Sequence, residues 1–97
     1  MNIQAMMQQA QKLQKEMLNV KKEIEAKEYV STQSFVTVSM KGTKQIKEIK
    51  IDADKLDKED IEILQDILCV AINENIKKID TEKDTKLGKF GNMSGLL

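Results

Sequence analysis

The first 22 residues of the chain, MNIQAMMQQAQKLQKEMLNVKK (residues 1–22), place an apolar side chain alternately every three and every four positions. The spacing continues without a break to residue 24, and the apolar residues are Ile3, Met6, Ala10, Leu13, Met17, Val20 and Ile24. This is the spacing of a heptad seam, the narrow stripe by which one α-helix packs against another. It predicts a helix from about residue 3 to about residue 27, roughly 37 Å long at about 1.5 Å per residue.

Beyond this helix the apolar spacing changes to the period of two that is typical of strands. In EYVSTQSFVTVSM (residues 28–40), apolar side chains at Val36, Val38 and Met40 occupy every second position. Such alternation places them on one face of a sheet. A weak break at residues 32–34 predicts that the segment contains two strands.

The next segment predicts a turn and a further strand. KGTK (residues 41–44) contains Gly42, a residue that can adopt a positive φ in a turn. QIKEIKI (residues 45–51) then places Ile49 and Ile51 on one face, whereas Ile46 is out of phase with them. An extra residue in one strand shifts the alternation in this way, so we expect an irregularity in this strand.

A second long helix is predicted to begin near Asp57, which suits the N-cap position and precedes a cluster of acids in the first turn. Its apolar positions form a broad stripe, which predicts burial against a sheet and also against a helix. The stripe consists of Ile61, Leu64, Leu68, Ile72, Ile76 and Ile79, widened by Ile63, Ile67, Val70 and Ala71. Residues 85–97 hold three of the four glycines and are expected to form a flexible tail.

The order of these segments predicts an α+β fold: a long N-terminal helix, a small antiparallel sheet of two to three strands, and a long C-terminal helix. Residues 1–84 are expected to form a single dimerising domain. A chain of 97 residues has a high ratio of surface to buried core, so an oligomeric partner would add to its stability. The narrow seam of the first helix predicts a helix as its packing partner, and a second copy of the chain would supply one.

Composition argues against several classes of protein. The chain has no His and a single cysteine, Cys69, in the apolar stretch DILCVAI, so we expect a buried core thiol rather than a nucleophile. No enzyme activity, metal site or cofactor is predicted, and the acidic stretch at residues 52–63 lacks the pattern of a calcium loop. No apolar run approaches the roughly 18 residues needed to cross a bilayer. We therefore expect a cytoplasmic protein.

Charge is balanced overall but uneven along the chain. All 16 basic residues are lysines, and they are matched by 16 acids. Residues 1–22 carry four Lys and one Glu, whereas residues 52–66 carry seven acids and two Lys. Lys12, Lys15 and Lys22 lie on the side of the first helix away from the seam. They fit either an ordinary solvated face or a surface that contacts a polyanion, because local patches govern such contacts.

Four stretches occur together in an order that resembles the YbaB/EbfC family of bacterial nucleoid-associated proteins. These stretches are MMQQAQKLQKEM (6–17), VTVSMKG (36–42), IKEIKID (46–52) and LQDILCVAINENIKKI (64–79). The resemblance covers roughly residues 3–83. It implies a tweezer-like homodimer that binds double-stranded DNA in the nucleoid. The chain departs from the family in having TQS at residues 32–34 instead of consecutive glycines, and in having no proline in its tail.

By position, the resemblance implies DNA contacts from the helices at both ends of the chain. The candidates are Lys12, Lys15, Lys22, Lys77 and Lys78, and charge alone adds Lys83, Lys86 and Lys89. Without arginine there is no guanidinium fork for the commonest guanine contact, so low sequence specificity is expected. A dimeric coiled-coil adaptor that binds another protein, with little or no affinity for DNA, is the alternative interpretation.

Overall fold

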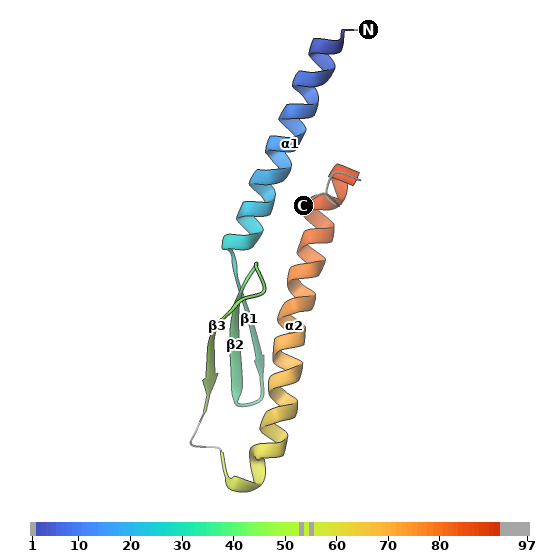
Figure 1. Ribbon diagram of the computed structural model, residues 1–97. Coiled ribbons are helices and arrows are strands. Elements are labelled where there is room, and N and C mark those ends of the chain that lie inside the picture. Colours follow the sequence, from blue (N-terminus) through green and yellow to red (C-terminus); the bar gives the residue numbers. More distant parts are fainter. Residues whose placement is uncertain (1, 53, 55, 92–97) are drawn as a thin grey trace.

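The computed structural model describes residues 2–52, 54 and 56–91, and it has the predicted α+β architecture. The elements in chain order are α1 (Ile3–Ala26), β1 (Glu28–Gln33), β2 (Val36–Lys41), β3 (Ile46–Ile51), η2 (Lys58–Asp60) and α2 (Ile61–Leu87). Figure 1 shows α2 running along the sheet and then beside α1, whose N-terminal half extends past the end of α2. Among the described residues, no helix is both long and apolar enough to cross a bilayer.

Helix α1 begins and ends within a residue of the prediction. Asn2 caps its start, because the Oδ1 atom of Asn2 accepts the backbone N–H groups of Gln4 at 3.1 Å and Ala5 at 3.4 Å. The helix ends where Lys27 turns to an extended conformation while its N–H still bonds to the carbonyl of Glu23 at 3.1 Å. The chain therefore leaves α1 directly into β1.

The three strands form one antiparallel sheet in the order β1-β2-β3. The predicted break between the first two strands is a tight turn that begins at Ser34, whose φ is 52°. The predicted irregularity lies between Ser39 and Met40, where the pairing of β2 with β3 shifts register and sets Met40 opposite Ile46. That shift brings the out-of-phase isoleucine onto the same face as the other two isoleucines of β3.

Gly42 serves a different purpose from the one predicted. The positive φ in this turn belongs to Lys44, at 71°, and not to Gly42. A Cβ atom on Gly42 would lie 1.7 Å from the carbonyl oxygen of Ile24, and the Gly42 N–H donates to the carbonyl of Lys27 at 3.0 Å. Glycine is needed because the turn packs directly against the end of α1.

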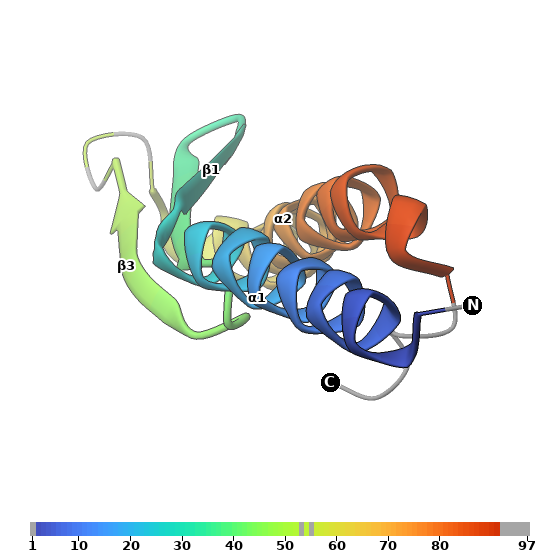
Figure 2. The same ribbon diagram turned by 90° about the horizontal axis from the view of Figure 1, so that it is seen from above.

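Helix α2 covers β1 and β2, and its start follows the prediction closely. Asp57 and Asp60 bond reciprocally across η2, from the Asp57 N–H to the Asp60 carboxylate and from the Asp60 N–H to the Asp57 carbonyl, both at 2.9 Å. Beneath the helix lie buried side chains from the sheet and from α2, which are Tyr29, Val36, Val38, Met40, Ala71 and Ile79. Figure 2 shows β3 at the edge of the sheet farthest from α2.

A buried asparagine also joins α2 to the sheet, which the apolar pattern did not predict. Asn75 is fully buried, and its Nδ2 atom donates to the carbonyl of Val38 at 2.9 Å. Its Oδ1 atom has no hydrogen-bond partner among the described residues.

Two predictions about the second helix need correction. Cys69 is exposed rather than buried, and Ile61, Ile63 and Val70 are exposed as well, so the sheet leaves these positions of α2 uncovered. The broad apolar stripe is therefore only partly covered within one chain.

The predicted boundary between the domain and the tail, at residue 84, falls inside α2. The helix continues to Leu87, and Leu87 and Phe90 are buried against Met17 and Ile24 of α1. Apolar side chains three residues apart on a helix lie on one face, and here that face meets the seam of α1. Residues 92–97 of the predicted tail lie outside the described residues.

Candidate nucleic-acid interface

The three lysines predicted on α1 are exposed, and their ammonium groups have no hydrogen-bond or ion-pair partner among the residues that the structure describes. Met17 is buried against α2, and Lys15 and Lys22 lie about 160° and 140° around the helix from it. Within the described part of the chain, neither of these lysines nor Lys12 makes a hydrogen bond or an ion pair. The stripe therefore presents unneutralised positive charge to solvent.

The two lysines predicted on α2 differ from each other. The Nζ atom of Lys78 donates to the carbonyl of Val30 at 2.7 Å, which ties α2 to β1. Lys77 makes no hydrogen bond or ion pair with any described residue. Both line a groove of ≈ 660 Å³ bounded by α2, β1 and the end of α1.

The same groove brings in two lysines that the family resemblance does not point to. Lys27, just past the end of α1, and Lys86, in the last turn of α2, line it together with Thr81 and Thr85. Charge alone suggests Lys86, and no sequence pattern suggests Lys27. Nothing in the sequence indicates that Lys27 and Lys86, 59 positions apart, share a groove.

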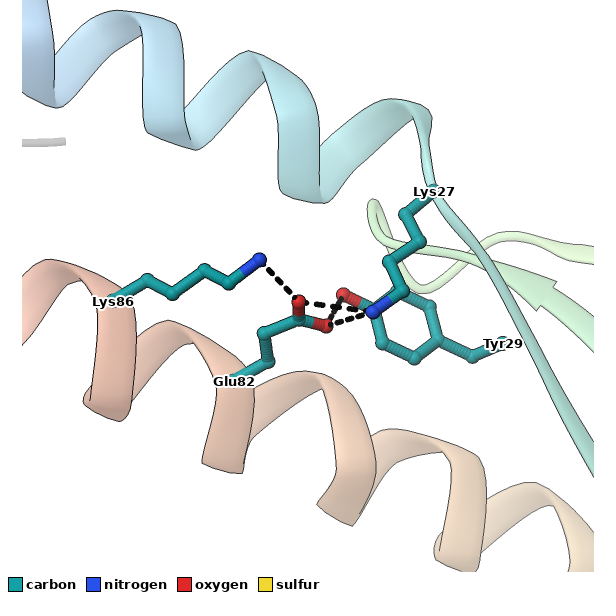
Figure 3. Close-up of polar contacts among 4 residues, drawn as sticks. All are labelled: Lys27, Tyr29, Glu82 and Lys86. Atoms are coloured by element: carbon teal, nitrogen blue, oxygen red, sulfur yellow. Dashed lines mark hydrogen bonds and ion pairs between the residues drawn. The ribbon is translucent and has the colours of Figure 1, made fainter.

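Glu82 holds these two lysines in place, as Figure 3 shows. Lys27 Nζ bonds to both carboxylate oxygens of Glu82, at 3.0 and 3.1 Å, and Lys86 Nζ lies 2.8 Å from Oε1. The hydroxyl of Tyr29 donates to Oε2 of the same carboxylate, and the Lys27 ammonium lies 5.3 Å from the centre of the Tyr29 ring. One carboxylate thus joins the end of α1, β1 and α2.

The cluster shifts the ionisation of its members in the directions expected for these contacts. The bonds from Lys86 and Tyr29, aided by Lys27, lower the pKa of Glu82 to about 2. Burial, and then the bond to the Glu82 carboxylate, raises the pKa of Tyr29, and the same carboxylate raises the pKa of Lys86. All three groups therefore keep their ordinary charge at neutral pH.

The second acid of the groove, Glu74, is also occupied by hydrogen bonds. Its Oε2 atom accepts from the hydroxyl of Ser31 at 2.8 Å and from the side-chain amide of Gln33 at 2.5 Å. These bonds, with help from nearby Lys78 and Lys77, lower the pKa of Glu74. Both acids of the groove are engaged with the protein, while four ammonium groups face or border it.

Among the described residues, the predicted seam of α1 is covered only at its C-terminal end. Met17 and Ile24 are buried and Val20 is half-buried, all against the end of α2. Toward the N-terminus the seam is bare, with Leu13 40% and Met6 53% exposed. Ala10 lies between them and is exposed as well.

Comparison with known proteins identifies relatives along almost the whole chain. The sequence profile of the YbaB/EbfC DNA-binding family matches residues 1–94. A nucleoid-associated protein of Lactococcus lactis subsp. cremoris is 44% identical over 92 residues, which cover 93% of this chain and 93% of that protein. A nucleoid-associated protein of Metamycoplasma arthritidis is 44% identical over 94 residues, or 97% of this chain and 99% of that one.

A solved structure shares the fold. The crystal structure of the uncharacterized protein HP0035 from Helicobacter pylori matches with a TM-score of 0.72 and covers 94% of this chain and 99% of its own. The two sequences are 22% identical, so this likeness concerns the fold alone.

Proposed function

Because this chain belongs to the YbaB/EbfC DNA-binding family, we propose that it is a nucleoid-associated protein that binds duplex DNA. Its relatives in Enterococcus faecalis and Lactococcus lactis carry the name nucleoid-associated protein, at 37% and 44% identity. In this proposal the protein acts as a homodimer, contacts backbone phosphates through lysines, and has low sequence specificity.

The observation that carries the proposal is the row of unpaired lysines on α1. An ammonium group without a carboxylate partner offers its full charge to a phosphate, and Lys12, Lys15 and Lys22 have no such partner among the described residues. Displacement of counterions from DNA by such groups drives association and makes it weaken steeply as salt rises.

Low specificity follows from the chemistry of the available cations. All 16 basic residues are lysines. Lysine is a flexible point charge that suits phosphate, whereas base readout in the major groove relies most often on the bidentate fork of arginine. The protein is therefore expected to distinguish duplexes weakly by their sequence.

A second copy of the chain is proposed because one chain leaves much apolar surface bare. Ile46, Ile49 and Ile51 of β3 are 40%, 41% and 38% exposed. They pair with buried residues of β2 and so lie on the face that α2 covers elsewhere. Uncovered apolar strips of this kind mark interaction surfaces, and a small domain gains stability by pairing.

One observation favours the adaptor as a second candidate. The N-terminal half of α1 carries Ile3, Met6 and Leu13 on one exposed stripe, which a helix from another protein would cover.

A salt titration separates the two functions. Fluorescence anisotropy of a labelled duplex should rise with protein at about 50 mM salt and lose affinity steeply toward about 200 mM. Absence of binding at the lower salt would contradict the DNA-binding proposal. A partner protein retained at a salt concentration that abolishes DNA binding would favour the adaptor.

A further inference from the structure

We propose that the groove between α2, β1 and the end of α1 binds backbone phosphates of one DNA strand, through Lys77, Thr81, Thr85 and Lys86. This inference rests on the proposed DNA-binding function and specifies a contact surface separate from the stripe on α1. The groove has a volume of ≈ 660 Å³ and is lined by all four of these residues.

The chemistry of the groove favours an anion. Its two acids already accept hydrogen bonds from the protein, Glu74 from Ser31 and Gln33, and Glu82 from Tyr29, Lys27 and Lys86. An ammonium group has three N–H donors. Lys86 contacts one carboxylate oxygen, and Lys77 makes no hydrogen bond or ion pair with a described residue, so donors remain in excess of acceptors.

The two threonines add neutral donors beside this charge. Thr81 and Thr85 are both exposed, and neither hydroxyl makes a hydrogen bond with another residue of the described chain. Each hydroxyl supplies one O–H donor, a group that commonly contacts DNA phosphates.

Glu82 prepares the groove for such a ligand. By holding Lys27 at 3.0 Å and Lys86 at 2.8 Å, it fixes two long side chains that would otherwise lose rotamer freedom on binding. The negative charge of Glu82 is shared between two ammonium groups, so the cluster around it remains positive.

The arrangement of donors along α2 favours a strand of nucleic acid over a single small ion. Lys77, Thr81 and Thr85 are four residues apart and lie on one face of the helix. From Lys77 to Thr85 they span about 12 Å of the helix axis. A row of this length can contact more than one phosphate of an extended backbone, whereas one free phosphate would meet only part of it.

Charge-neutral variants test the direct contact. Thr81→Val with Thr85→Val removes two hydroxyls and keeps β-branched side chains on the helix. We expect duplex affinity at about 50 mM salt to fall about three- to tenfold, as befits the removal of one or two hydrogen bonds. The matched control is Thr32→Val with Thr37→Val, a pair that hydrogen-bonds across β1 and β2 at 3.1 Å, and it should bind as the unaltered protein does.

The lysines are tested through the salt slope, the slope of the logarithm of the binding constant against the logarithm of the salt concentration. Lys77→Gln with Lys86→Gln should lower the magnitude of the slope by about 1 for each phosphate that the variant no longer neutralises. Lys50→Gln with Lys58→Gln removes the same charge from exposed positions on β3 and η2 and should leave the slope unchanged. Circular dichroism confirms that all variants are folded.

The outcomes are distinct. Threonine and lysine variants that match their controls, in a protein that otherwise binds duplex DNA, would overturn the groove and leave the DNA-binding function in place. No binding by the unaltered protein would overturn both. NMR shifts at Thr81 and Thr85 with inorganic phosphate, without any effect of the threonine variants on duplex binding, would indicate a free-anion site and also overturn the proposal.

Discussion

At the scale of single residues, Gly42 illustrates how the chain joins its helix to its sheet. A Cβ atom at this position would meet the carbonyl of Ile24 at 1.7 Å, so Gly42→Ala must push the turn away from α1. We expect a loss of about 2–4 kcal/mol in the free energy of unfolding, measured with urea. Gly88→Ala is the control, because a Cβ there has nothing within 4 Å and the backbone is helical. Equal unfolding midpoints for the two variants would contradict the close approach.

The ionisation of Glu82 predicts how the stability of the fold depends on pH. Its folded pKa of about 2 lies below the ordinary value of 4.5, so the carboxylate stabilises the fold above pH 4.5. This contribution is lost as the pH falls from about 4.5 to about 2. Glu82→Gln should cost about 1–2 kcal/mol at pH 7, because partly exposed charged bonds are worth only that much.

The test is the difference in melting temperature between the unaltered protein and Glu82→Gln, measured from about pH 7 down to about pH 2. The difference should be largest at neutral pH and shrink toward the acid end of the range. A difference that stays constant with pH would rule out the ionised cluster as its source. Glu16→Gln, at an exposed position without a hydrogen bond or ion pair in the described chain, should show no such trend.

Residue roles are the part least accessible from the sequence. Lys27 and Tyr29 lie 55 and 53 positions from Glu82, so periodicity could not bring them together. Gly42 is visible as a turn residue, but its role comes from the approach of another element. The apolar neighbours of Cys69 predict a core position, yet the sheet of one chain leaves this position of α2 exposed.

At the scale of elements, periodicity predicted most of the fold. A seam spaced by three and four residues located α1 to within one residue, and an out-of-phase Ile46 indicated the register shift in β3. The glycines after residue 84 suggested a tail from residue 85, because glycines commonly mark the end of a helix, whereas α2 continues to Leu87. Gly88 instead keeps a helical conformation, with φ at −58°, and Leu87 and Phe90 then reach the seam of α1.

The side of α2 that faces β3 carries the exposed thiol of Cys69, which allows a test of the proposed dimer. Cys69, Ile72, Ile76 and Asp80 share one side of α2, and Asp80 bonds to Lys44 of the β2–β3 turn at 2.8 Å, so this side faces β3. If a second copy covers that face, the thiol of Cys69 should react slowly with a thiol reagent where sedimentation shows a dimer. Dilution to monomer should restore fast reaction.

The control is the double variant Cys69→Ala with Lys58→Cys, whose single thiol lies at an exposed position on η2. Its thiol should react fast at every protein concentration. Fast reaction of Cys69 within a sedimenting dimer would show that the second copy does not cover the β3 side of α2. A monomer at all concentrations would contradict the homodimer itself.

At the scale of the whole molecule, the chain is long and thin. It measures 71 × 18 × 15 Å, and its radius of gyration of 19.3 Å exceeds the roughly 13 Å expected of a compact domain of about 100 residues. This shape leaves one side of each helix exposed to solvent. It suits a protein that presents charge to a long polyanion, and it leaves apolar strips that a second copy would bury.

In the proposed function, Lys12, Lys15 and Lys22, which have no partner among the described residues, hold DNA phosphates. The decisive experiment is the salt dependence of duplex binding for Lys12→Gln, Lys15→Gln and Lys22→Gln combined. We expect a large loss of affinity at about 50 mM salt and a slope smaller by about 1 for each phosphate left without its lysine. The charge-matched control, Lys41→Gln, Lys50→Gln and Lys58→Gln combined, should keep its slope. Equal affinity and slope for the two triple variants would contradict the claim.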